Sequence, residues 1–335
     1  MKKYLLPNEG NFYKANLHCH SNLSDGLLSP EKLKELYKAH GYSVLAYTDH
    51  DILIPHNELT DDSFVALSGF EAQFNGSNKY PGVPNEKKCH ICIIAGTPDI
   101  VEQPCWNEEY AYIGNAAINK KNVQIDEQTS PFVREYSYQS INKMIKTCRE
   151  KGFFITYNHP SWSLENYEQY INYDGMHALE IFNYSCEFLG YQTYAPSIYD
   201  DILKSGKKIF AVAADDNHNK NLPDSFGGFV MIKAKKLKYE AITEALFNGD
   251  FYSSTGPKIY ELYVEDNKVH IKCSDAVMVR FTTDRRISKC VWSEDGKSVT
   301  EAVFDLNSEC KYFRITVKDI NGNYANTNAY FTEDI

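Results

Sequence analysis

One pattern repeats seven times between residues 15 and 218 of this 335-residue chain and limits the folds that the chain can adopt. Each repeat is a short apolar run, rich in β-branched and aromatic residues, followed by a polar side chain that can bind a metal ion. Such runs predict β-strands, here at residues 15–20, 43–50, 64–71, 89–95, 153–159, 178–183 and 208–218. Helical patterns lie between several of them, and this alternation predicts a parallel sheet.

The clearest helical pattern spans residues 29–40. Ser29 suits the N-cap, Pro30 suits the first turn, and Gly41 suits the position just after the helix. Two further helices are predicted at residues 138–151 and 239–248. Residues 96–137 are less regular, and we expect them to form an excursion over the mouth of the fold.

Polar side chains at the ends of many strands favour a closed barrel, because an open doubly wound sheet has its site at one switch point. After Gly256-Pro257 the pattern changes to short alternating strands, and Asn321-Gly322 is typical of a hairpin turn. These strands are predicted at residues 259–264, 268–273, 278–283, 289–292, 299–304, 312–318 and 324–331. We therefore predict an α/β barrel over residues 1–257 and a small antiparallel β-sandwich over residues 258–335.

Charge and composition exclude several classes of protein. The net charge is −10 and no run is rich in lysine and arginine, which argues against a nucleic-acid partner. The first residues lack the apolar run of a signal peptide, and no apolar stretch is long enough to span a bilayer, so we expect a cytoplasmic protein without a membrane partner. Nine cysteines predict reduced thiols. Cys89 and Cys92 would point to opposite faces of a strand, so we interpret them as structural cysteines.

The strongest local motif is His18-Cys19-His20, followed by Asp25. On a strand the two histidines project to the same face, where both can reach one metal ion. An isolated pair of this kind is more often structural. However, further candidates lie at the ends of other predicted strands, so that six of the ten histidines would meet on one rim of a barrel. These candidates are His50, Glu71, His90, His159, Asp216 and His218.

Together these residues resemble the PHP family, named for polymerase and histidinol phosphatase. The resemblance covers residues 15–220 and rests on His18-x-His20, Ser24-Asp25-Gly26, Thr48-Asp49-His50, Gly69-x-Glu71, Asn158-His159-Pro160 and Asp216-x-His218. The stretch at residues 244–256 and the β-rich region after it are similar to stand-alone members with a C-terminal β-domain.

The resemblance implies a distorted (β/α)7 barrel that holds two to three divalent transition metals (Zn, Mn or Fe). It assigns His18, His20, Glu71 and Asp216 to a first ion. Glu71 would bridge to a second ion, held also by His90 and His159, and Asp25, His50 and His218 would hold a third. Glu71, Asp216 and His159 are the candidate catalytic residues.

A pair of close metal ions can hold a bridging hydroxide as a nucleophile. We therefore expect a phosphoesterase that acts on a small phosphomonoester or phosphodiester. The same site would also suit an amide, carbamate or ester, and a non-catalytic metal-binding module is a further alternative. Phosphate specificity requires cationic groups near the metals, whereas Trp106 and Trp162 could line a pocket for a carbonyl substrate.

Three other residues have weaker assignments. Arg134 is a candidate phosphate clamp, although a solvated arginine is the preferred interpretation. Asp49 is expected either to orient a metal ligand or to bond within a turn. Glu180 is expected to form a structural hydrogen bond.

Overall fold

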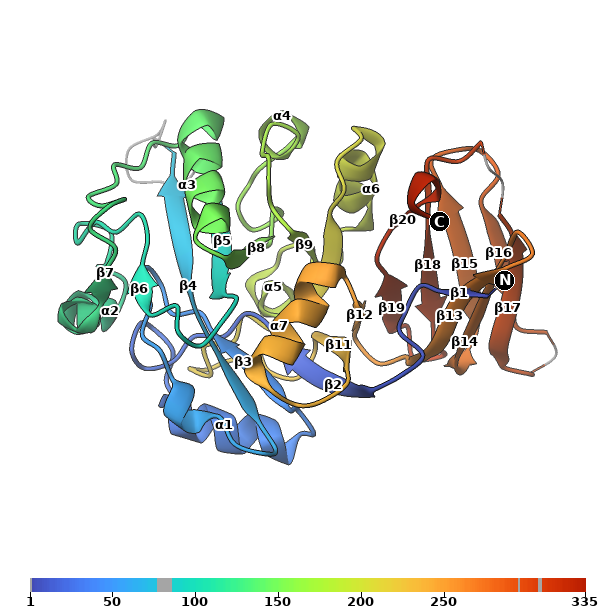
Figure 1. Cartoon of the computed structure of the whole chain (residues 1–335), viewed down its shortest axis with the longest axis horizontal. Coiled ribbons are helices and arrows are strands. Elements are labelled where there is room, and N and C mark those ends of the chain that lie inside the picture. Colours follow the sequence, from blue (N-terminus) through green and yellow to red (C-terminus); the bar gives the residue numbers. More distant parts are fainter. Residues whose placement is uncertain (1, 77–85, 295, 307–308) are drawn as a thin grey trace.

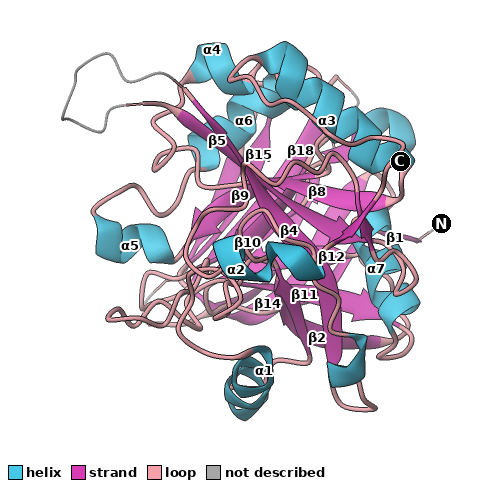
Figure 2. Ribbon diagram, turned by 90° about the vertical axis from the view of Figure 1, so that its left-hand side faces the viewer, coloured by secondary structure: helices cyan, strands magenta, loops and turns pink. Residues whose placement is uncertain are grey.

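The computed structural model describes residues 2–76, 86–294, 296–306 and 309–335. In Figure 1 the helices surround strands in one part of the molecule, and a helix-poor β-module lies beside it. Both termini lie in the β-module. Figure 2 shows helices α1, α3 and α7 around the outside of the central strands. None of the helices in these residues is long and apolar enough to cross a membrane.

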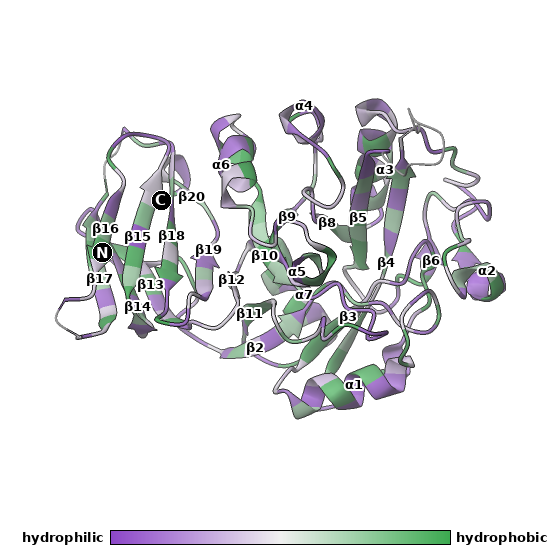
Figure 3. Ribbon diagram, turned by 180° about the vertical axis from the view of Figure 1, so that it is seen from behind, coloured by the Kyte–Doolittle hydropathy of each residue, from purple (hydrophilic) through white to green (hydrophobic). Residues whose placement is uncertain are grey.

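Each of the seven predicted runs overlaps a strand of one large sheet, although the first strand ends at Asn16, so that His18 and His20 follow it and do not lie on it as predicted. These strands are β2 (Asn11–Asn16), β3 (Val44–Tyr47), β4 (Val65–Asn75), β5 (Lys88–Ala95), β8 (Phe153–Tyr157), β9 (Ala178–Asn183) and β10 (Phe210–Ala214). They lie side by side in the order β10-β9-β8-β5-β4-β3-β2, and β11 (Phe229–Ala234) and β12 (Phe251–Ser254) follow. The inner strands of this sheet are largely hydrophobic (Figure 3), as expected for strands covered on both faces.

The prediction that these strands form a parallel sheet is wrong at β5. Strands β2, β3 and β4 pair in parallel, as do β8, β9 and β10, but β5 is antiparallel to both β4 and β8. A strand that returns directly beside its predecessor is antiparallel, because a parallel neighbour needs a crossover. As a result, the N-terminal end of β5 lies beside the carboxyl ends of the other strands.

The predicted closed barrel is also wrong. Among the described residues no strand ladder joins β10 to β2, and the sheet continues from β2 into β11 and β12. The edge of β2 is already paired with β11 from Asn11 to Ala15 and is unavailable to β10. Beyond the ends of the two strands, an isolated bridge between Cys19 and Asn217 brings their extensions together.

The three predicted helices are present. Helix α1 (Pro30–Ala39) begins after Ser29, whose hydroxyl accepts from the backbone N–H of Lys32. The others are α3 (Tyr138–Glu150) and α7 (Tyr239–Asn248). Shorter helices are α2 (Ala116–Asn119), α4 (Tyr167–Tyr170), α5 (Ser185–Leu189) and α6 (Pro196–Lys204), with 3-10 turns at η1 (Asn57–Leu59), η2 (Lys120–Asn122) and η3 (Thr332–Asp334).

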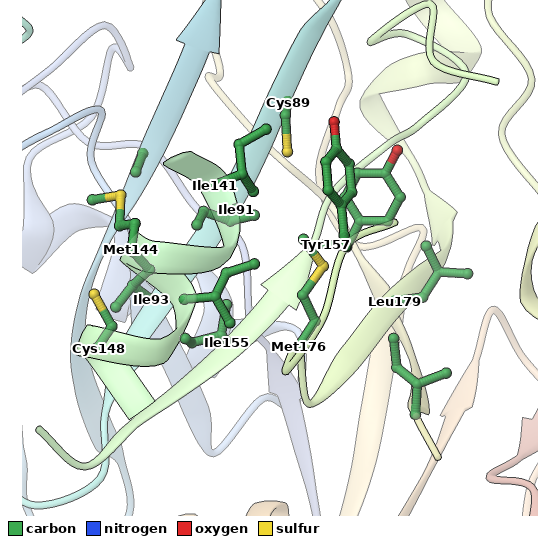
Figure 4. Close-up of a cluster of buried hydrophobic side chains, with 14 of the residues drawn as sticks. Cys89, Ile91, Ile93, Ile141, Met144, Cys148, Ile155, Tyr157, Met176 and Leu179 are labelled. Atoms are coloured by element: carbon green, nitrogen blue, oxygen red, sulfur yellow. The ribbon is translucent and has the colours of Figure 1, made fainter. Parts of the chain in front are cut away.

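Helix α3 covers one face of the sheet. Its side chains Ile141, Met144 and Cys148 are buried against Ile91 of β5 and Ile155 of β8 (Figure 4). Burying this apolar face is the main source of helix stability in a packed domain. The core therefore holds β5 and β8 in the positions from which they supply His90 and His159.

The excursion at residues 96–137 contains β6 (Glu102–Gln103), β7 (Gln124–Ile125) and α2. Its residues Trp106, Ala111 and Ala116 pack with Ile52 in a small apolar cluster of their own. In Figure 1 the excursion lies at the end of the molecule opposite the β-module.

The C-terminal strands match the prediction, except that the last predicted strand, at residues 324–331, is divided into two. They are β13 (Ile259–Glu265), β14 (Lys268–Ala276), β15 (Met278–Thr283), β16 (Lys289–Trp292), β17 (Val299–Asp305), β18 (Tyr312–Lys318), β19 (Tyr324–Thr327) and β20 (Tyr330–Phe331). Strands β13, β14 and β17 form a sheet with β1 (Lys3–Tyr4), and the others extend the large sheet. Pairing therefore crosses residue 257 at β1–β13 and at β12–β19.

Candidate metal centre

All nine predicted metal ligands meet at one end of the strands of the large sheet. Eight come from β4, from β5, or from the segments that follow β2, β3, β8 and β10, and Asp25 comes from the loop between β2 and α1. Because β5 runs antiparallel to its neighbours, His90 near its start lies at the same end of the sheet as the residues that follow the other strands. Six of the nine side chains are almost fully buried, whereas Asp216, Asp25 and His218 are 12%, 20% and 24% exposed.

The four residues predicted to hold the first ion lie in mutual contact. His20 Nε2 lies 3.1 Å from His18 Nε2 and 3.1 Å from Asp216 Oδ1, and His18 Nε2 lies 3.2 Å from Glu71 Oε1. Ligands placed about 2.1 Å from a tetrahedral ion are separated by about 3.4 Å. The spacing of these donor atoms therefore fits a shared cation.

The second and third predicted sets are also assembled, with some donors shared. Glu71 Oε1 lies 3.2 Å from His90 Nδ1 and 3.3 Å from His159 Nε2. Asp25 Oδ1 lies 3.4 Å from His218 Nε2 and 3.7 Å from His50 Nε2.

Several donors lie close to more than one of the predicted sets. Besides its place in the first set, His20 lies with Asp25, His50 and His218 in one group of close donor atoms. His50 also approaches Glu71, with Nδ1 3.1 Å from Oε2. The three sets therefore form one continuous cluster.

Unpartnered polar atoms test whether this cluster fits a metal. Asp25 Oδ1, His20 Nδ1, His50 Nδ1 and both ring nitrogens of His90 are buried without a hydrogen bond of acceptable geometry. A buried polar atom left unpaired costs about 1–3 kcal/mol, so native proteins rarely leave several together. Divalent cations would satisfy these imidazole and carboxylate atoms, and the residues therefore fit a multinuclear metal centre.

The electrostatics of the cluster favour ionised carboxylates. Burial raises the pKa of Glu71, but the charge and hydrogen bonds of the surrounding histidines, His18 foremost, together outweigh burial and hold that pKa well below its usual value. The pKa of Asp216 is lowered for the same reason, despite its burial. Burial lowers the pKa of His50 and of His90, which keeps both rings in the neutral form that binds metals.

Glu180 on β9 lies behind His18 and fixes its ring. His18 Nδ1 donates to Glu180 Oε1 at 2.7 Å, and the backbone N–H of His159 donates to Oε2 at 3.0 Å. A carboxylate on the far nitrogen orients a metal-binding histidine and raises its basicity. The structural hydrogen bond predicted for Glu180 is confirmed, and its partner is the candidate ligand His18.

Asp49 holds the loop that carries Asp25. Its carboxylate accepts from the backbone N–H and the hydroxyl of both Ser21 and Ser24. These two serines lie 28 and 25 residues from Asp49 in the sequence, so the expected bond within a turn is wrong. The carboxylate instead holds the separate loop that carries Asp25, a candidate ligand.

We predict that Glu180→Gln weakens metal binding about 10–100-fold while the chain stays folded. The substitution keeps the shape of the side chain but removes the charge that supports His18. Competition with a chromogenic chelator measures the affinity. Glu187→Gln, on the neighbouring helix α5, is the control and should bind metal as the wild type does. Unchanged affinity in the Glu180→Gln variant would show that this carboxylate does not support a ligand.

A cavity of about 420 Å³ opens above the cluster. Besides the metal ligands, its lining includes two cations, Lys88 and Lys220, and the aromatic ring of Trp162. Sequence reasoning missed both lysines. Lys88 lies two residues before His90 on β5, and on a strand such a spacing gives the same face. Lys220 lies in the loop that follows β10, where no strand period could indicate it.

Among the described residues, those that line this cavity do not include Arg134 or Trp106. The Arg134 guanidinium forms an ion pair with Asp51, and its side chain is only 3% exposed. It also lies over the ring of Tyr110, 4.5 Å from the ring centre. Arg134 is therefore not solvated, and its charge is already paired. Trp106 is buried in the excursion.

The two cysteines of the predicted strand have different surroundings. Cys89 is buried in the apolar core beneath α3 (Figure 4). Cys92 instead lies with His18 and Glu71, and Asn158 Nδ2 donates to its sulfur at 3.0 Å. The interpretation of both as structural cysteines therefore overlooked the position of Cys92 in the metal centre.

Comparison with known sequences gives one short similarity. A 5'-3' exoribonuclease of Haemophilus influenzae is 52% identical over 40 residues, which are 12% of this chain and 15% of that protein. The match thus spans much less than two thirds of the exoribonuclease. No family model matches the chain.

Three solved structures are similar to this one at low identity. A two-domain protein of Bacteroides vulgatus with a predicted PHP-like metal-dependent phosphoesterase is 14% identical, with a TM-score of 0.46 and coverage of 98% of this chain and 97% of that chain. A proposed metal-dependent phosphoesterase of Bifidobacterium adolescentis is 17% identical, with a TM-score of 0.40 and coverage of 65% and 91%. An amidohydrolase of Chromobacterium violaceum with bound sulfate and no metal is 12% identical, with a TM-score of 0.38 and coverage of 61% and 87%. Two of these three solved structures are described as predicted or proposed metal-dependent phosphoesterases, one of them as PHP-like.

Proposed function

We propose that this protein is a metal-dependent phosphoesterase that hydrolyses a small phosphomonoester or phosphodiester. The observation that carries the proposal is the presence of Lys88 and Lys220 in the cavity that seven of the nine cluster residues line. Phosphoryl transfer depends on positive charge around the transferred group more than on covalent help from the protein.

The two lysines approach the cluster from different sides. Lys88 precedes His90 on β5, and its amine donates to Asn75 Oδ1 at 2.9 Å. The amine of Lys220 lies 3.7 Å from Asp25 Oδ2, and its side chain is 52% exposed. Both ammonium groups have remaining N–H donors that can bind an anionic substrate.

Within the cluster, Glu71, Asp216 and His159 converge. His159 Nε2 lies 3.3 Å from Glu71 Oε1 and 3.7 Å from Asp216 Oδ2. We assign these three residues to the reacting centre, where they would hold the ions that contact the substrate. When bound, two or three divalent ions would supply Lewis-acid charge and an activated water.

The dimensions and charge favour a small substrate. A cavity of about 420 Å³ is in the range of sites for small molecules. The net charge of −10 opposes the approach of a long polyanion. An amide, carbamate or ester is the second candidate substrate, because Trp162, Ile113 and Leu189 add an apolar wall.

The deciding assay is a panel of sugar phosphates, nucleotides and amino-alcohol phosphates, beside carbamates and aryl esters, with the zinc- or manganese-loaded enzyme. We expect phosphate release from at least one member. We expect Lys220→Ala to raise KM about fivefold, since an exposed charge contributes roughly 1 kcal/mol to binding. Lys236→Ala, outside the cavity lining, is the matched control.

Cleavage of a carbamate or ester without phosphate release would transfer the assignment to the second candidate. Turnover of none of these compounds by the metal-loaded protein would favour a non-catalytic metal-binding module.

A further inference from the structure

Strand β5 carries a second metal-binding side chain that the nine-residue assignment does not include. Cys92 lies two residues after His90, so both side chains project to the same face of the strand. The sulfur of Cys92, a ring nitrogen of His18 and a carboxylate oxygen of Glu71 lie within 4.8 Å of one another. All three side chains are buried.

Hydrogen bonds connect Cys92 to the centre. Asn158 Nδ2 donates to Cys92 Sγ at 3.0 Å and to Glu71 Oε1 at 2.7 Å. One amide group therefore holds the sulfur and the carboxylate side by side. An N–H donor directed at sulfur also stabilises negative charge there, as a metal-bound thiolate requires.

We propose that Cys92 is a sulfur ligand of the ion held by His18 and Glu71, and that it makes this position selective for a thiophilic ion such as zinc. This inference rests on the metal centre of the proposed function and adds the preference among metals. Imidazole and carboxylate donors alone suit several divalent ions, whereas a thiolate favours zinc over manganese or magnesium. On binding, the thiol proton is released to solvent as the metal–sulfur bond forms.

Cobalt substitution tests the proposal through a signal that is independent of catalysis. A cysteine ligand produces a thiolate-to-cobalt charge-transfer band in the near ultraviolet. We expect this band in the cobalt-loaded full chain and its loss in Cys92→Ser. Cys89→Ser, on the same strand but facing the core, should retain it. All the proteins should carry Cys290→Ser, since Cys290 is exposed and could bind cobalt by itself.

A second measurement compares metals directly. We expect Cys92→Ser to weaken zinc binding about tenfold or more and to leave manganese binding within about threefold. Circular dichroism shows whether the variant is folded. If Cys92→Ser does not fold, the wild-type spectrum still decides, because a cobalt-loaded protein without the band overturns the proposal.

Persistence of the band in folded Cys92→Ser would also overturn the proposal, since another cysteine would then be the ligand. The proposed function fails by a different result. A protein that shows the band but releases no phosphate keeps the sulfur ligand and loses the phosphoesterase assignment. A protein that releases phosphate without the band keeps the phosphoesterase assignment and loses the sulfur ligand.

Discussion

Glu71→Gln is expected to lower kcat at least about 10³-fold, a rise of roughly 4 kcal/mol in the activation barrier. The Glu71 carboxylate has an oxygen within 3.5 Å of a ring nitrogen of each of His18, His20, His50, His90 and His159. No other carboxylate in the described cluster lies so close to as many candidate ligands. Glutamine keeps the volume and one acceptor oxygen but removes the charge that holds neighbouring cations together.

The measurement combines steady-state rates with elemental analysis of the same samples. We expect the wild-type protein to hold two to three ions per chain and Glu71→Gln to hold fewer. Glu168→Gln, at an exposed position on α4, is the control and should match the wild type. If the rate of Glu71→Gln were within about tenfold of the wild type, with full metal content, Glu71 would not be a bridging ligand.

Removal of the metals is expected to abolish activity and to destabilise the folded chain. The cluster brings buried carboxylates and histidines together, and several of their polar atoms have no hydrogen-bond partner. An ion present at a thousand times its Kd stabilises the native state by about 4 kcal/mol per site. Chelation should therefore lower the thermal midpoint by on the order of 10 °C.

Scanning calorimetry of the metal-loaded, chelated and reloaded protein measures this shift. We expect zinc or manganese to restore both the midpoint and the rate. Glu71→Gln should show a smaller shift, which separates specific binding from effects of the chelator. The multinuclear assignment is refuted by a protein that binds less than one ion per chain after reloading and melts at the same temperature in all three states.

Local sequence patterns determined much of the architecture. The cap and first-turn residues Ser29 and Pro30 predicted the start of α1, because they satisfy backbone groups within a few residues. Seven C-terminal strands were predicted from their alternating pattern, and the structure has a strand at each, with the last one divided into β19 and β20. His18 and His20 were paired by the same period, and the structure places their Nε2 atoms 3.1 Å apart.

The tertiary structure decided the rest of the candidate centre. Three features depend on residues far apart in the chain. They are the reversed direction of β5, the open edge between β10 and β2, and the ion pair of Arg134 with Asp51. The placement of Glu180 behind His18 and of Cys92 beside Glu71 depends on which strands become neighbours. A pattern of period two gives the face on which a side chain lies, whereas strand order and direction determine what it meets there. The sequence by itself therefore determined the strands, the capped helices and the identity of nine candidate ligands, and only the folded chain decided how those ligands are shared and which lysines lie beside them.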